Sequence, residues 1–390
     1  MTGPARERLL DRVRMRLAED VADADIGRVT LQESELLLDS VVLAELSGQV
    51  SAQLRGAGPL EELLALPGVT DVLVNAADSV WIDRGRGLER TTTRFPCDDA
   101  VRDLAARLAA QAGRRLDDAS PFVDAALPDG TRLHAILPPL TAHPAISLRV
   151  LARRQLSLAD LISAGAISSE VGELLRAIVA ARLTVLISGG TGTGKTTLLS
   201  ALLATVDCSE RIVTVEDAAE LAVSHPHVVG LVSRAVNTER AGAVGLAELV
   251  RQALRMRVDR LVVGEFRGGE ITELLTALNT GHAGGAATVH ANSVRDVPSR
   301  LVALGALGGM PSEVLLAQAA SALDVLVHVA RDRSGTRRVA EIALWPGDHA
   351  GNAAGLVWHA AGGVGPAAWE LSRRICAAGV TVPPLLGATQ

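Results

Sequence analysis

Residues 189–197 constrain the possible folds of this chain more than any other feature, because they read Gly-Gly-Thr-Gly-Thr-Gly-Lys-Thr-Thr. This run satisfies G-x-x-x-x-G-K-[ST], the pattern of a phosphate-binding loop. Its glycines allow backbone N–H groups to turn toward phosphate oxygens without Cβ clashes, and the following helix presents its positive end to them. An apolar run at 183–188 predicts a buried strand before the loop, and 196–204 predicts a helix after it. The sequence therefore predicts a site for ATP, or a close relative, together with Mg²⁺.

Each part of this loop has an expected role. Lys195 places an ammonium group against the β- and γ-phosphates, and Thr196 offers a hydroxyl ligand to Mg²⁺. The predicted nucleotide-binding residues are Gly189, Gly190, Thr191, Gly192, Thr193, Gly194, Lys195, Thr196 and Thr197. A chance match is the alternative in a chain with 37 glycines, but the position between a strand and a helix argues against it.

An acid ends a second apolar run downstream of the loop. Residues 261–264 read Leu-Val-Val-Gly and lead directly into Glu265. A carboxylate at the end of such a strand can hold magnesium through water or polarise a water molecule. We interpret Glu265 as the residue that orients or activates the attacking water, and its alternative role is a strand-end acid paired with Arg267.

A third run, at residues 213–215, ends in Glu216 and Asp217, with Glu220 one turn later. Parallel sheets place their ligands at the carboxyl ends of strands. Glu216 is accordingly a candidate for the metal shell with Thr196. A structural role remains equally open, in which Asp217 and Glu220 cap and charge the next element.

Two histidines, His282 and His290, stand eight residues apart in a glycine-rich stretch. No third ligand lies at metal spacing, so we expect no zinc site. His282 follows an expected helix and is positioned to sense a γ-phosphate, and His290 ends a strand-like segment. For both, a structural histidine is the alternative.

Length and patterning predict the domain organisation. A chain of 390 residues commonly forms two domains, and alternating buried strands and helices predict an α/β fold with a mainly parallel sheet. We expect a helical extension at 1–55, an α+β domain at 56–152, a linker at 153–175, an ATPase domain at 176–345 and a tail at 346–390.

Composition indicates which partners the chain is expected to bind and in which compartment it is expected to work. Aromatic residues make up 2% of the chain and the net charge is -6, which argues against nucleic-acid binding. The three cysteines lie far apart, so a disulfide framework and a cysteine zinc site are not expected. The charged N-terminus and the absence of a long apolar run favour a cytoplasmic protein.

In this order, the motifs resemble those of the secretion ATPases of type II and type IV systems, with the tight-adherence (Tad/Flp) pilus branch closest. The resemblance covers roughly residues 60–345. Besides the phosphate loop, it is carried by residues 113–117, 127–132, 146–149, 210–217, 253–268 and 281–293. It implies a RecA-like motor domain preceded by a smaller α+β domain. It also implies that Glu216 lies in the family's acidic box, Glu265 in Walker B, and His282 and His290 in the histidine box.

The resemblance also implies how such a motor works. Arg132 and Arg149 match arginines of the N-terminal domain that close onto the γ-phosphate during hydrolysis. The implied assembly is a homohexamer that works with inner-membrane platform proteins at the cytoplasmic face of the inner membrane. There, ATP hydrolysis drives pilus assembly or protein export. Two alternatives remain at this stage: a nucleic-acid translocase, and a nucleotide-dependent assembly module without turnover.

The sequence departs from the family pattern at three positions. Ala126 replaces a usual arginine, Val258 a usual proline, and Phe266 a small aliphatic residue. Loss of the arginine at 126 is expected to remove a subunit or nucleotide contact. The residues expected to carry the chemistry are all present.

Overall fold

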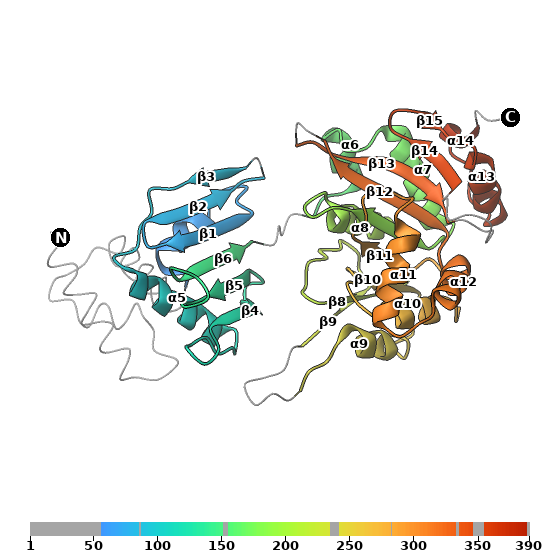
Figure 1. Ribbon diagram of the computed structural model, residues 1–390. Coiled ribbons are helices and arrows are strands. Elements are labelled where there is room, and N and C mark those ends of the chain that lie inside the picture. Colours follow the sequence, from blue (N-terminus) through green and yellow to red (C-terminus); the bar gives the residue numbers. More distant parts are fainter. Residues whose placement is uncertain are drawn as a thin grey trace. The chain divides into compact units, whose positions relative to one another are not determined.

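A computed structural model gives the structure of two compact units, Met1–Ala152 and Arg153–Gln390 (Figure 1). The structure describes residues 56–85, 87–150, 155–234, 242–281, 283–332, 335–345 and 355–387. The helical extension expected at 1–55 lies outside the described residues. No helix in these ranges is long and apolar enough to cross a membrane.

The first unit is built on a six-stranded antiparallel sheet in the order β3-β2-β1-β6-β5-β4. Its strands are β1 (Asp71–Ala76), β2 (Ser79–Asp83), β3 (Leu88–Arg90), β4 (Phe122–Ala126), β5 (Arg132–Ile136) and β6 (Ala145–Arg149). Its helical elements are η1 (Gly58–Leu60), α4 (Glu61–Leu64) and α5 (Asp98–Gln111). The first turn of α5 carries Asp98 and Asp99, and their negative charge stabilises the positive N-terminal end of the helix.

Alternating burial divides the two faces of this sheet. Leu133 and Leu148 are fully buried in a core shared with Leu104 and Leu108 of α5. Because successive side chains of a strand point to opposite faces, Arg132 stands on the face away from this core. The same alternation on β6 puts Arg149 on that face as well.

The second unit is built on a nine-stranded sheet in the order β15-β14-β13-β12-β7-β11-β10-β8-β9. The strands are β7 (Val185–Gly189), β8 (Ile212–Glu216), β9 (Val228–Val232), β10 (Arg260–Val263), β11 (Ala286–Val289), β12 (Val325–Arg331), β13 (Arg337–Leu344), β14 (Gly355–His359) and β15 (Gly363–Val364). All pairings from β12 to β9 are parallel, and β13, β14 and β15 add antiparallel strands at the other edge.

Helices cover both faces of this sheet (Figure 1). One apolar core holds α6 (Leu158–Ser163), α7 (Ser169–Ala180), α8 (Lys195–Leu203), α13 (Ala368–Ala377) and α14 (Pro384–Gly387). The other holds α9 (Leu246–Ala253), α10 (Ile271–Leu278), α11 (Val297–Leu307) and α12 (Ser312–Ala322). Since the central strands are buried on both faces, they read as continuous runs of Val, Ile and Leu. The predicted α/β class, with a RecA-like unit after a smaller α+β unit, is confirmed.

Two segments contribute more to the second unit than their expected roles imply. The described part of the predicted linker contains α6, and Ser168 caps α7 by accepting a hydrogen bond from the Val171 N–H. Both helices belong to the core. The described part of the predicted tail supplies two edge strands and α13, whose Leu371 is fully buried. The alanine- and glycine-rich composition of the tail concealed its packing face.

Candidate nucleotide site

The topology of the second unit gathers the sequence motifs at one edge of its sheet. Strands β8, β10, β11 and β7 are parallel neighbours, with Val215 opposite Val263 and Ser188 opposite Val289. Their carboxyl ends therefore meet on the same side. That side is where open α/β sheets bind ligands.

The phosphate loop leaves β7 at Gly189 and enters α8 at Lys195. Gly192 and Gly194 have φ values of 72° and 96°, a region that residues with a Cβ rarely adopt. A Cβ on Gly189 would lie 2.5 Å from the carbonyl oxygen of Val329 and 2.7 Å from Oγ1 of Thr193. The loop is thus both turned by its glycines and packed too closely against β12 to accept a side chain at Gly189.

Lys195 is held inside this loop, and its side chain is 8% exposed. Its Nζ donates to the carbonyl oxygens of Gly189 at 3.2 Å and Gly190 at 3.0 Å, and lies 3.3 Å from Nδ1 of His290. Burial lowers the pKa of Lys195, and the nearby Glu265 carboxylate opposes this effect. The lysine is therefore a desolvated cation that contacts only neutral carbonyl oxygens within the loop. Charged phosphate oxygens would form stronger hydrogen bonds with it than these two carbonyls do.

Glu265 follows β10 and meets three cationic or basic groups. Its Oε2 accepts from Nε of Arg267 at 2.9 Å, so the structural role considered for this acid is present. Its Oε1 lies 2.6 Å from Nε2 of His290 and 3.6 Å from Nζ of Lys195. Within the described residues, this buried Oε1 has no well-aligned hydrogen bond. The carboxylate thus combines an anchored oxygen with one that is available to a water molecule.

His290, which follows β11, bridges the lysine and the acid. Burial lowers its pKa first, and the adjacent Lys195 lowers it further. We infer a neutral ring whose Nδ1 faces the lysine as acceptor and whose protonated Nε2 faces the carboxylate, since an ammonium group can only donate. The structure thus brings together Lys195, Glu265 and His290 from three separate motifs.

Glu216 ends β8 and is only 4% exposed. Its Oε1 accepts the backbone N–H groups of Glu220 at 3.0 Å and Leu221 at 2.9 Å. Burial raises its pKa to about 7, and these two hydrogen bonds oppose the rise. A Cβ on Gly264 would lie 2.9 Å from Cγ of Glu216, so the glycine before Glu265 makes room for this side chain. Glu216 therefore holds the loop that follows β8, and its metal role stays a prediction.

The structure pairs the two candidate arginines of the first unit. Arg132 and Arg149 are directly opposite each other on β5 and β6. Nε of Arg149 donates to Oδ1 of Asp71 at 3.0 Å, which holds one arginine in place while its side chain is still 59% exposed. Ala126, one of the departures from the expected sequence pattern, is the register neighbour of Arg132 on β4. Their predicted role toward phosphate stays a prediction, and His282 lies outside the described residues.

Sequence reasoning missed a set of contacts on the other side of the loop. Nε of Arg337 donates to the carbonyl oxygen of Gly192 at 2.9 Å, and Nδ1 of His328 lies 3.0 Å from Oγ of Ser188. These partners are 145 and 140 residues apart in the chain. Ser188 is recognisable as the residue before the motif, but no spacing signal singles out Arg337 or His328.

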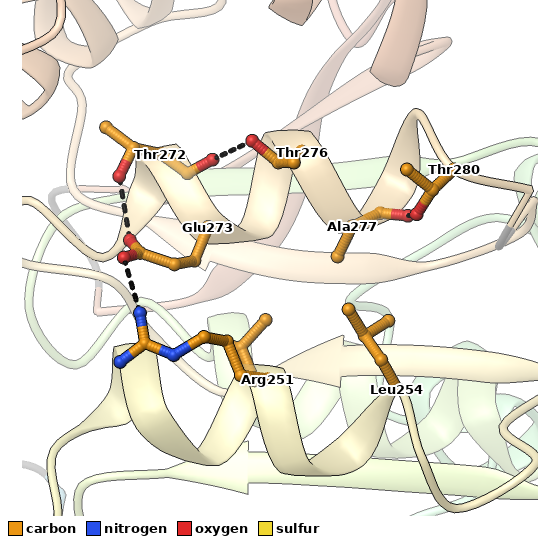
Figure 2. Close-up of a pocket in the computed structure, with 8 residues that line it drawn as sticks. Arg251, Leu254, Thr272, Glu273, Thr276, Ala277 and Thr280 are labelled. Carbon is orange, nitrogen blue, oxygen red and sulfur yellow. Dashed lines mark hydrogen bonds and ion pairs between the residues drawn. The ribbon is translucent and has the colours of Figure 1, made fainter.

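A separate pocket of about 270 Å³ lies between α9 and α10 (Figure 2). It is lined by Val250, Arg251, Leu254, Thr272, Glu273, Thr276, Ala277 and Thr280. Nη1 of Arg251 pairs with Oε1 of Glu273 at 3.3 Å, and the hydroxyl groups of Thr276 and Thr280 donate to α10 carbonyls. These polar groups are already hydrogen-bonded or ion-paired within the two helices, so the pocket lacks the inward-facing donors that a phosphate site requires.

The geometry around the loop fits a nucleotide with Mg²⁺. The loop is turned as a phosphate cradle requires, Lys195 is buried within it, and Oε1 of Glu265 lacks an aligned partner. Thr196 lies half-buried in the first turn of α8, where its hydroxyl is a suitable ligand for a hard cation.

Comparisons with known proteins support this reading. The sequence profile described as "Type II/IV secretion system protein" matches residues 53–354. The chain belongs to this family. The expected resemblance to the type II and type IV secretion ATPases is thereby confirmed, while the narrower assignment to the tight-adherence branch stays a prediction.

Proteins similar to this chain come from several bacteria. It is 55% identical over 332 residues to a Mycobacterium tuberculosis protein named "Putative conjugal transfer protein", covering 83% of this chain and 94% of that one. It is 31% identical to the conjugal transfer protein TrbB of Rhizobium radiobacter, covering 70% and 83%. The ATPase DotB of Legionella pneumophila matches in fold with a TM-score of 0.51, at 21% identity, covering 74% and 80%.

Proposed function

We propose that this chain is an ATP hydrolase whose second unit binds ATP·Mg²⁺ and directs water onto the γ-phosphate. One observation carries the proposal: Lys195, Glu265 and His290 come from three motifs and converge within 2.6 to 3.6 Å of one another. If these three groups formed only a structural ion-pair network, there would be no reason for a phosphate loop to lie beside them. A buried lysine, a half-buried acid and a cradle of glycines together match the needs of phosphoryl transfer.

The residues present suggest how the site works. Phosphate oxygens would replace the carbonyls of Gly189 and Gly190 as the partners of Lys195. Glu265, relieved of the lysine, would then use Oε1 to orient a water molecule, while Arg267 keeps Oε2 fixed. Neutral His290, whose Nε2 lies 2.6 Å from the same Oε1, would keep that oxygen in position. Mg²⁺, when bound near Thr196, would neutralise charge that develops on the phosphates.

We further propose that the first unit completes the site. In this account nucleotide binding draws Arg132 and Arg149 toward the γ-phosphate, and hydrolysis releases them. Their shared position on one exposed sheet face supports the idea, because both could reach a ligand from one direction. An arginine on a separate body would couple movement of that body to phosphoryl transfer.

The biological work that we propose is secretion or pilus assembly. The family of the chain and the conjugal-transfer names of its relatives support this role. We expect a homohexamer bound to membrane platform proteins at the cytoplasmic face of the inner membrane. The tight-adherence pilus is the system that we favour.

Phosphate release with purified full-length protein tests the ATPase. Wild type should release phosphate in a Mg²⁺-dependent way. Lys195→Ala should lose both tight ATP binding and turnover, because it removes the buried cation of the loop. The matched control is Arg338→Ala, which removes an exposed cation elsewhere in the second unit. A wild-type rate that Lys195→Ala leaves unchanged would show that the phosphate loop is not the source of the activity.

A second experiment tests the closure proposal. Arg149→Ala should leave the Kd for ATP near the wild-type value and lower turnover by about 10³-fold, the usual scale for an arginine finger. Asp71→Asn serves as the control, because it removes the charge of the group that holds Arg149 and leaves the arginine itself in place. Unchanged turnover in Arg149→Ala would retire this role for the arginine while leaving the ATPase proposal intact.

A further inference from the structure

The phosphate loop has two flanks, and the motif residues occupy only one of them. Strand β7 lies between β11 and β12. Glu265 and His290 reach the loop from the β10 and β11 side. The opposite flank is formed by the β12–β13 hairpin, which no motif predicted.

This hairpin is fitted closely to β7 and the loop. His328 is in register with Ser188, and the two side chains are 3.0 Å apart. Val329 is in register with Gly189, and its carbonyl oxygen lies where a Cβ on that glycine would clash. Further along the hairpin, Arg337 extends across the tip of the loop.

Two contacts fix the position of Arg337. Its Nε donates to the carbonyl oxygen of Gly192 at 2.9 Å. Its Cδ lies 3.5 Å from the position that a Cβ on Gly194 would take. The charged end of the side chain therefore rests on the outer surface of the loop at its two left-handed glycines.

The physics of a phosphate loop explains why such a contact matters. When the N–H groups of a loop turn inward to bind an anion, its carbonyl groups turn outward and need donors of their own. The Gly190 carbonyl oxygen accepts from Oγ1 of Thr193 and from Nζ of Lys195. The Gly192 carbonyl oxygen accepts from Nε of Arg337.

We propose that Arg337 is a positioning residue for nucleotide binding. This inference rests on the proposed nucleotide function and adds a residue to it. Arg337 anchors the Gly192 carbonyl, so that the loop N–H groups stay turned toward the phosphates, and it adds positive charge on the flank away from Glu265. Because the acid and His290 mark the γ-phosphate side, Arg337 serves the phosphates that ATP and ADP share.

The test compares nucleotide affinity with turnover in the full-length protein. The variants are Arg337→Ala, Arg337→Lys and the neighbouring control Arg338→Ala, whose side chain is also exposed but points to the other face of β13. Kd is measured with N-methylanthraniloyl-ATP and with N-methylanthraniloyl-ADP, and KM and kcat are measured by phosphate release.

Arg337→Ala should raise both Kd values by about ten-fold, the scale of one lost charge-assisted hydrogen bond, and change kcat by less than about two-fold. Arg337→Lys should recover part of the affinity, because it restores a charged donor. Arg338→Ala should bind both nucleotides as wild type does. Thermal unfolding confirms that each variant is folded, and if Arg337→Ala is not, Arg337→Gln replaces it as a neutral variant that keeps a donor.

Three results would overturn the proposal: an unchanged Kd in Arg337→Ala, a lower kcat with unchanged Kd, or an equal loss of affinity in Arg338→Ala. The outcome is separable from that of the proposed function. A wild-type protein that binds nucleotide without releasing phosphate would refute the ATPase while the Kd comparison still decides the role of Arg337.

Discussion

Replacing Glu216 by glutamine should stabilise the second unit, and the gain should depend on pH. Glu216 is 4% exposed, and burial raises its pKa from the ordinary 4.5 to about 7. The folded chain therefore holds the carboxyl proton more tightly than the unfolded chain does. Below pH 4.5 the group is neutral in both states and costs nothing.

As the pH rises from 4.5 to about 7, stability is lost, because the unfolded chain releases this proton first. At about 1.4 kcal/mol for each pH unit, the full loss is about 3 kcal/mol. Glutamine avoids this cost, since it is neutral at every pH and its carbonyl oxygen can still accept from Glu220 and Leu221. The difference in stability between Glu216→Gln and wild type should therefore grow by about 3 kcal/mol between pH 4.5 and pH 8.

Urea unfolding at a series of pH values measures this difference. A Trp81→Phe background leaves Trp345, Trp358 and Trp369 as fluorophores, all of which belong to the second unit. Glu220→Gln is the matched control, because its charge is a minor cause of the raised pKa of Glu216. A stability difference that stays constant from pH 4.5 to pH 8 would refute the burial argument for Glu216.

Two further substitutions test the packing around the site. Gly189→Ala should weaken ATP binding by about ten-fold or more and cost about 1–3 kcal/mol of stability, because its Cβ would lie 2.5 Å from a Val329 oxygen; wild-type Kd and Tm would contradict this. Arg260→Met should cost about 3–5 kcal/mol in urea unfolding, since Arg260 pairs with Glu210 through Nε at 2.8 Å and Nη2 at 2.9 Å while its side chain is 3% exposed; an unchanged unfolding midpoint would show that the pair contributes nothing.

The motifs predicted the α/β class and the convergence at one sheet edge for a physical reason. Parallel strands put their carboxyl ends together, so Lys195, Glu265 and His290 had to lie near one another once each was assigned to a strand end. Their individual contacts could not be predicted in the same way. The use of Glu216 to hold two backbone N–H groups depends on the turn that follows β8.

Other features depend on contacts between distant segments. The contact of Arg337 with Gly192 joins positions 145 residues apart through an antiparallel hairpin, and neither periodicity nor spacing reports such a pairing. The edge strands and α13 in the predicted tail have too few large apolar residues to give a clear pattern. That these strands belong to the second unit becomes clear only from their pairing in the nine-stranded sheet.

The central claim is that Glu265 acts on water at a phosphate site built around Lys195. Its most direct test measures the ATP Kd and the phosphate release rate of wild type and Glu265→Gln on the same preparations. For Glu265→Gln we expect a Kd within a few-fold of wild type and a rate lower by about 10²-fold or more, as for loss of a general base. Equal phosphate release by the two proteins would contradict it.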